Sequence, residues 1–222
     1  MSNIKANIKN VKTIVKSMRK DENPIEIIAV TKTFGTDSIL EALNCGIKHI
    51  GESKIQEALL KIQALNGKLS GITKHFIGHL QSNKAKKAVE NFDLIQSLDS
   101  LELAKSIDKY ANSIGKVQEC LIEVKISNEP SKTGIAPQEL GDFYSQCLDF
   151  PNILVKGLML IAPLNADARA SFKQGFKLFE KLKSKDFNIL SMGMSDDYKI
   201  ALEEGANMLR IGSAIFGKRD YK

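Results

Sequence analysis

The stretch "IEIIAVTKTF", residues 25–34, contains five apolar residues interrupted by a single glutamate, and then a lysine, Lys32, just beyond them. A short apolar run of this kind is typical of a strand buried on both faces, as in a parallel sheet. Apolar residues at helical spacing follow it, at Ile39, Leu40 and Leu43. The stretch therefore predicts a strand, a connection that carries Lys32, and a helix.

Seven similar runs follow in chain order: "HIGES", "HFIGHL", "LIQSL", "CLIEVKIS", "LVKGLMLIAP", "ILSMGMS" and "MLRIGSAIFG". Helical patterns lie between runs, and glycines stand where helices are expected to end, at Gly46, Gly67, Gly115 and Gly205. Eight strand–helix steps in a chain of 222 residues predict a (β/α)8 barrel. An open doubly wound sheet is the alternative that the same pattern allows.

The opening segment is amphipathic, with apolar residues at helical spacing: Ile4, Ile8, Val11, Ile14, Val15 and Met18. We predict a helix over residues 1–20 that packs on the barrel. The last strand leaves no room for a following helix before Lys222, so the N-terminal helix is expected to fill that place in the outer ring. Because no Gly/Ser linker interrupts the chain, residues 1–222 are expected to form one α/β barrel domain, without a C-terminal β domain.

The chain is basic, with a net charge of +6 and a pI near 9.1, but only four of its 32 basic residues are arginine. The lysines are spread along the chain and tryptophan is absent, which favours a solvated lysine-rich surface over a nucleic-acid interface. No secretory signal and no run of about 20 apolar residues is found, so we expect a cytoplasmic protein without a membrane span. The three cysteines lack metal-ligand spacing and are interpreted as reduced packing residues.

Lys32 is the first candidate site residue. In a (β/α)8 barrel the functional groups gather where strands end and the following loops begin. A lysine beside apolar walls is partly desolvated there and can act as an amine nucleophile that forms a Schiff base with an aldehyde. Most lysines after a strand are simply solvated, so position alone leaves both interpretations of Lys32 open.

Two sequence features near the C-terminus favour phosphate binding. Ser195 precedes two acidic residues and a helical pattern, which predicts an N-cap. Gly212 and Ser213 are small residues whose backbone N–H groups can approach an anion closely. Each feature alone would be an ordinary cap or a tight turn. Together with Lys32 on the first strand, which neighbours the eighth in a closed barrel, they predict a site for a phosphorylated aldehyde.

Arg210 lies between Leu209 and Ile211 in the last apolar run, so we expect it to be buried and to need a partner. One candidate partner is a barrel carboxylate such as Glu52. The other is the acceptor nitrogen of a bound heteroaromatic ring. The sequence pattern leaves both open.

Two further motifs each allow more than one interpretation. His75 and His79 lie four residues apart and would point to the same side of a strand. We interpret His79 as a rim histidine rather than a metal ligand, because no third ligand is apparent. Lys132 and Gly134 belong to the loop "SNEPSKTGI", which either closes over the site or forms an exposed turn after a proline.

Six stretches resemble one known family: "AVTKTF", "HIGES", "HFIGHLQSNK", "SNEPSKTGI", "GLMLIAP" and "SMGMSDDYKIALEEGANMLRIGSAIFG". They are similar, in the same order, to the YggS/PROSC family of pyridoxal 5′-phosphate (PLP)-binding proteins, also called pyridoxal phosphate homeostasis proteins. The resemblance implies a single barrel like the N-terminal domain of bacterial alanine racemase. It implies that Lys32 carries PLP as an internal aldimine and that Arg210 faces the pyridine nitrogen. By the same resemblance Ser195, Gly212 and Ser213 would meet the phosphate.

One position departs from the family pattern. The usual Gly-Glu-Asn after the second strand is Gly51-Glu52-Ser53 in this chain. Serine is shorter than asparagine and lacks its amide donors. The contact made at this position is therefore expected to be weaker or mediated by water.

The resemblance implies a role in intracellular PLP homeostasis with little or no turnover of a dedicated substrate. An arginine at the pyridine nitrogen keeps its proton and leaves the ring a weak electron sink. A PLP-dependent amino-acid racemase of low activity is the alternative, and it would need a second acid/base group. A Schiff-base aldolase and a basic RNA-binding module are weaker alternatives. We expect a monomer whose partners are PLP and PLP-requiring apo-enzymes.

Overall fold

The computed structural model describes residues 3–18, 24–126, 133–163 and 167–217. Eight parallel strands form a closed barrel in chain order: β1 (Glu26–Val30), β2 (His49–Glu52), β3 (Thr73–Phe76), β4 (Leu94–Leu98), β5 (Gln118–Val124), β6 (Ile153–Leu160), β7 (Ile189–Ser191) and β8 (Met208–Ile211). Because β8 pairs with β1, the sheet closes on itself. The predicted (β/α)8 barrel is confirmed, and the open-sheet alternative is wrong.

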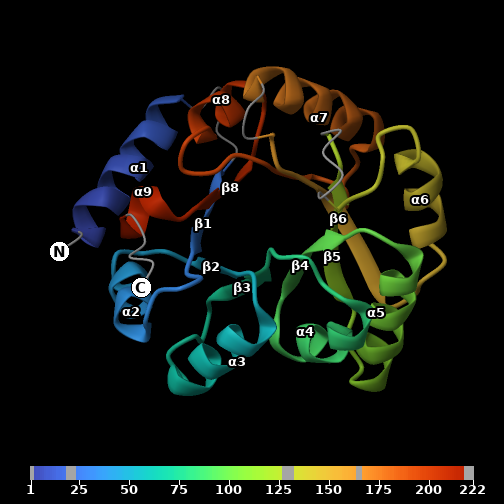
Figure 1. Ribbon diagram of the computed structural model, residues 1–222, viewed down its shortest axis with the longest axis horizontal. Coiled ribbons are helices and arrows are strands. Elements are labelled where there is room, and N and C mark those ends of the chain that lie inside the picture. Colours follow the sequence, from blue (N-terminus) through green and yellow to red (C-terminus); the bar gives the residue numbers. More distant parts are fainter. Residues whose placement is uncertain (1–2, 19–23, 127–132, 164–166, 218–222) are drawn as a thin grey trace.

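Helices surround the strands as an outer ring (Figure 1). They are α1 (Ile4–Met18), α2 (Thr36–Asn44), α3 (Ile55–Ala64), α4 (Ala85–Asn91), α5 (Leu101–Ser113), α6 (Leu140–Cys147), α7 (Ala168–Leu182), α8 (Tyr198–Glu203) and α9 (Ser213–Phe216), with the 3-10 turn η1 (Ser82–Lys84) before α4. Each longer helix buries an apolar stripe against the sheet, so the helices bury the outer face of the barrel.

The N-terminal helix α1 contacts α9, α2 and α8, and so closes the ring between the last and the first helices (Figure 1). Its buried face consists of Ile4, Ile8, Val11 and Val15. The sequence left no room for a helix after the last strand, yet the structure has the one-turn helix α9 there. The side-chain amide of Asn7 donates to Ile215 O at 2.8 Å, which ties α1 to α9.

Apolar clusters lie on both sides of the barrel wall. Ile28, Leu94, Leu121, Met159 and Met208 pack together in the barrel interior. The larger core lies between the strands and the helices. Since side chains alternate along a strand, a residue two positions from an interior residue also faces the interior. This rule decides which polar side chains enter the barrel.

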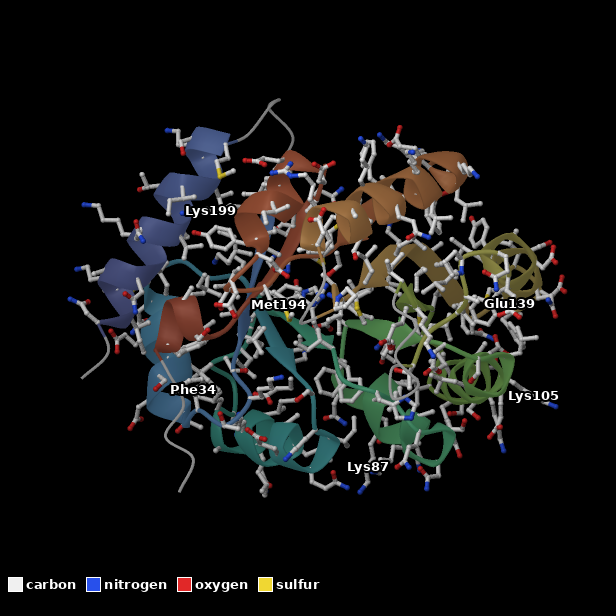
Figure 2. All side chains as sticks on the ribbon, turned by 45° about the horizontal axis from the view of Figure 1, so that its top comes forward. Phe34, Lys87, Lys105, Glu139, Met194 and Lys199 are labelled. Carbon is white, nitrogen blue, oxygen red and sulfur yellow. The ribbon has the colours of Figure 1, made fainter. Side chains whose placement is uncertain are left out.

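Several lysines of the outer ring are solvated. Figure 2 shows Lys87, Lys105 and Lys199 on outer helices, and all three are exposed. The described cysteines are all free thiols, and burial raises the pKa of the Cys147 thiol to about 12. Among the described helices, none has the length and apolar character that a membrane span requires.

Candidate functional site

Lys32 lies on a tight turn just beyond the C-terminal end of β1, where it is half-buried. The backbone N–H of Phe34 donates to Thr31 O at 3.0 Å and closes the turn around Lys32 and Thr33. Thr33 has a φ of 70°, a region that β-branched residues rarely adopt. The turn therefore holds Lys32 at the C-terminal mouth of the barrel in a strained backbone.

Helix α3 supports this turn from the outside of the barrel. Lys61 Nζ donates to Thr31 O at 2.7 Å, to Glu52 Oε1 at 2.8 Å and to Glu57 Oε1 at 2.6 Å. Glu57 also accepts from the backbone N–H of Thr33, and Glu52 accepts from Thr31 Oγ1 at 2.6 Å. Burial raises the pKa of Glu52, although its hydrogen bonds to Lys61 and Thr31 oppose that rise. The network fixes both ends of the Lys32 turn to α3.

Ser195 meets the end of β8. Its Oγ accepts from the backbone N–H of Gly212 at 3.1 Å and from that of Ala214 at 3.0 Å. Two main-chain donors at the start of α9 thus converge on one oxygen. Ser213, between them in sequence, is exposed. This corner offers what a small anion requires: convergent N–H donors, a hydroxyl, and a glycine without a Cβ.

The sequence-based N-cap assignment for Ser195 was wrong. Helix α8 begins at Tyr198, and its N-cap residue is Asp197, which makes no side-chain capping bond. The Asp197 carboxylate instead accepts from the backbone N–H of Met194 at 2.6 Å. Ser195 serves the donors of α9, because barrel closure brings the end of β7 beside the end of β8.

Arg210 lies on β8, two residues after the interior residue Met208, and is only 4% exposed. It donates through Nη1 to Ser191 Oγ at 2.7 Å and through Nη2 to Leu160 O at 2.8 Å. Burial lowers the pKa of Arg210 to about 10, while the charge of Glu123 opposes this. Arg210 therefore stays a cation at neutral pH inside the barrel.

Glu52 is not the partner of Arg210. Adjacent residues of a strand face opposite sides, and a Cβ on Gly51 would lie 2.8 Å from the interior side chain of Ile28. Glu52 consequently faces α3, where it bonds Lys61. The alternative of an ion pair between Glu52 and Arg210 is ruled out.

The acidic side of the mouth was missed from the sequence. Glu123 lies on β5, two residues after the interior residue Leu121, and burial raises its pKa. Burial also raises the pKa of Asp99, which directly follows β4. The glutamate within the apolar run "CLIEVKIS" could have indicated Glu123 as a site residue. Carboxylates are rarely buried in a strand unless they are paired.

The two histidines of "HFIGHLQSNK" have separate environments. Strand β3 ends at Phe76, so His75 is a buried strand residue and His79 belongs to the loop beyond it. The expectation that both point to the same side of one strand was wrong. His79 Nδ1 lies 3.3 Å from Asp99 Oδ2 at the C-terminal rim, and the His79 side chain is half-exposed.

The loop after β5 is described only from Thr133 onward, so Lys132 lies outside the described residues. Thr133 Oγ1 donates to Glu123 Oε1 at 3.2 Å. Gly134 has a φ of 117°, and a Cβ there would lie 2.8 Å from the backbone nitrogen of Lys125. This glycine lets the loop return against the end of β5.

The chain is similar to proteins of known name over nearly its whole length. The alanine racemase N-terminal domain family matches residues 1–220. A pyridoxal phosphate homeostasis protein of Pasteurella multocida is 38% identical over 219 residues, which cover 96% of this chain and 94% of the relative. The chain belongs to the family of pyridoxal phosphate homeostasis proteins. A family member of Aquifex aeolicus is 40% identical over 209 residues, 91% of this chain and 90% of that relative.

Solved structures agree with this assignment. The structure of PipY from Synechococcus elongatus with PLP bound matches with a TM-score of 0.86 and 34% identity, covering 97% of this chain and all of PipY. Alanine racemase of Clostridium difficile matches with a TM-score of 0.71 and 16% identity, over 99% of this chain and 57% of the racemase. The racemase likeness shows the shared barrel fold of homeostasis proteins and racemases.

Proposed function

We propose that this chain binds PLP through a Schiff base on Lys32 and takes part in intracellular PLP homeostasis, with little or no turnover of a dedicated substrate. The observation that supports this most strongly is the pairing of β1 with β8. Ile28 stands beside Arg210 in the ladder, and the backbone of Gly212 lies against Val30. The Lys32 turn, the corner formed by Ser195 and Gly212, and the Arg210 side chain therefore lie at the same end of the barrel.

The residues of this mouth fit the three polar parts of PLP. Ser195 Oγ suits the phosphate together with the N–H groups of Gly212 and Ala214 that donate to it, because a hydroxyl and two main-chain donors lie together at this end of the barrel. Arg210 is a buried donor suited to the pyridine nitrogen. Lys32 provides the amine for the aldehyde. Binding of PLP by the relative PipY and the name of the curated relatives support the same cofactor.

Lys32 would hold the cofactor covalently, because a lysine amine can condense with the aldehyde of PLP to give a Schiff base and one molecule of water. Arg210 would face the pyridine nitrogen and keep its own proton at neutral pH, because its pKa is about 10. Bound PLP supplies an electron sink for amino-acid chemistry, and without a protonated ring nitrogen that sink is weak. This favours a carrier over an efficient enzyme.

The test is an absorbance spectrum of the purified protein with PLP, before and after borohydride reduction, followed by peptide mapping. We expect a visible band that reduction removes, with the label on Lys32. Lys32→Ala should abolish the band, whereas Lys54→Ala, an exposed lysine after β2, should retain it. A label on another lysine, or a chain that takes up no PLP, would refute the proposal.

A weak amino-acid racemase is separated from a carrier by exchange of the substrate Cα hydrogen with deuterated water. We expect no exchange above that of free PLP with common amino acids. We further propose a cytoplasmic monomer that passes PLP to PLP-requiring apo-enzymes. Sedimentation at micromolar concentration tests the monomer, and PLP transfer to an apo-enzyme across a dilution series tests the delivery.

A further inference from the structure

A line of polar side chains starts at Arg210 and crosses the barrel interior. Arg210 Nη1 donates to Ser191 Oγ at 2.7 Å, and Ser191 Oγ donates to Gln96 Oε1 at 2.7 Å. The amide nitrogen of Gln96 lies 3.1 Å from Nδ1 of His75. Ser191 and Gln96 are fully buried, and His75 is 1% exposed. The line therefore joins β8, β7, β4 and β3 through the middle of the barrel.

From His75 the line continues to the opposite mouth. His75 Nε2 lies 2.9 Å from His49 Nδ1, and His49 Nε2 lies 2.7 Å from Glu26 Oε2. The Glu26 side chain is 42% exposed. Both Glu26 and His49 line a cavity of about 850 Å³ at the N-terminal ends of the strands, with His75, Glu119 and Met208. One end of the line is thus at the candidate cofactor site and the other is open at the far mouth.

Hydrogen-bond chemistry allows only one direction along this line. Arginine has donors only, so Ser191 must accept from Arg210 and give its hydroxyl hydrogen to the carbonyl oxygen of Gln96. The Gln96 amide then donates to Nδ1 of His75. A neutral histidine that accepts at Nδ1 carries its hydrogen on Nε2.

The tautomer of the second histidine, His49, is fixed in turn by its two partners. Nε2–H of His75 donates to Nδ1 of His49, so His49 carries its hydrogen on Nε2 and donates it to the Glu26 carboxylate. Burial lowers the pKa of His75 to about 3, with smaller effects of His49 and Lys74, which agrees with a neutral ring. Every bond thus points from the cation Arg210 to the anion Glu26.

We propose that Gln96 and His75 are positioning residues: they fix the guanidinium of Arg210 for the cofactor and couple it to the His49–Glu26 pair at the opposite mouth. The proposal rests on the proposed function, because it assigns Arg210 to the pyridine nitrogen. Since every residue between Arg210 and Glu26 both accepts from the one before it and donates to the next, none of them can reverse without its neighbours. A substitution at Gln96 should consequently alter the hydrogen bonds both of Arg210 and of the His49–Glu26 pair.

The first test needs no cofactor. Nitrogen-15 NMR of the imidazole groups in the PLP-free wild-type chain should show His75 and His49 both neutral, with hydrogen on Nε2, at pH 7.5. The wild-type spectrum is informative whether or not any variant folds. Hydrogen on Nδ1 of His75 would overturn the proposal.

Gln96→Glu is the decisive variant. A carboxylate accepts from Ser191 but has no hydrogen for His75, so His75 must carry hydrogen on Nδ1 and accept at Nε2. His49 must then donate from Nδ1 while it still donates from Nε2 to Glu26, which makes it an imidazolium at pH 7.5. Gln118→Glu is the matched control, since buried Gln118 bonds Asp93 O and Glu119 O and is not in the line. Unchanged histidines in Gln96→Glu would overturn the proposal.

The second test uses the chain loaded with PLP. A carboxylate at position 96 draws the Arg210 guanidinium toward the barrel centre, so Gln96→Glu should shift the visible band and weaken PLP binding about tenfold. Gln118→Glu should do neither. If wild type binds PLP and Gln96→Glu matches it in band and affinity, the positioning role is refuted while the proposed function stands. If wild type binds no PLP, the proposed function fails and the coupling of Arg210 to a cofactor fails with it, whatever the histidines show.

Discussion

Phe34 and Phe216 stack with their ring centroids 4.7 Å apart and their planes 29° from parallel. Phe34 closes the Lys32 turn. Phe216 ends α9, whose first residues form a corner with Ser195. Figure 2 shows Phe34 beside α9. The stack therefore joins the two parts of the mouth to which we assign the aldehyde and the phosphate of PLP in the proposed function.

Removing this stack should loosen the mouth. For Phe34→Ala we expect a loss of about 1–2 kcal/mol in the free energy of unfolding, because a half-buried ring contact is lost. We also expect weaker PLP binding. Urea denaturation and a PLP titration measure the two effects. Phe34→Leu keeps apolar bulk but has no ring to stack, so it should recover only part of the stability, and full recovery in Phe34→Leu would contradict the stacking role.

Ser195→Ala should weaken PLP binding about tenfold while changing the free energy of unfolding by about 1 kcal/mol. The variant removes the hydroxyl on which the Gly212 and Ala214 N–H groups converge. Ser184→Ala is a matched control, because Ser184 Oγ accepts a similar 3.1 Å bond from Phe187 N away from the mouth. Equal PLP affinities for the two variants would argue against the phosphate corner.

Lys61→Met should destabilise the fold by about 3 kcal/mol. The Lys61 and Glu52 side chains are 12% and 6% exposed, so the variant leaves a buried carboxyl without its cation, and the pKa of Glu52 should rise further. The exposed pair of Lys86 and Glu90 provides the control, and Lys86→Met should cost less than about 0.5 kcal/mol. Urea denaturation of both variants checks the difference, and similar losses would contradict a buried clamp.

Thr33→Gly should stabilise the fold by about 0.5–1 kcal/mol. The variant relieves the unfavourable φ of 70°, which outweighs the extra chain entropy of glycine in the unfolded state. Thr36→Gly, at the first residue of α2, should instead destabilise, because glycine is a poor helix former. Thermal unfolding of both variants measures this contrast. A loss of stability in Thr33→Gly would show that the turn is not strained.

His75 should make the fold sensitive to acid. Its pKa is about 3 when folded and near 6.5 when unfolded, so between these values the unfolded chain binds one more proton. The stabilising contribution is complete above pH 6.5 and is lost as the pH falls, at up to about 1.4 kcal/mol per pH unit. Urea denaturation from pH 7.5, above both pKa values, down to pH 4.5, between them, should show a shallower decline for His75→Gln than for wild type. Parallel curves would refute this.

The strands and their order could be predicted from the amino-acid pattern. Eight apolar runs such as "IEIIAVTKTF" are spaced for strand–helix repeats, and short buried strands linked by helices have the barrel as a natural closure. The pattern also singled out Lys32, Gly212 and Arg210, because an amine at a strand end, a glycine after a strand and a charge within an apolar run are local anomalies. Family resemblance gave them roles that remain predictions.

The contacts between polar groups follow from the folded barrel. Ser195 binds the donors of α9 rather than capping α8, because closure of the barrel places the ends of β7 and β8 together. Glu52 faces α3, and the line from Arg210 to Glu26 draws its members from strands far apart in the sequence. Such contacts depend on register and on the inward or outward side of each strand, which a one-residue slip would reverse. No local pattern encodes them.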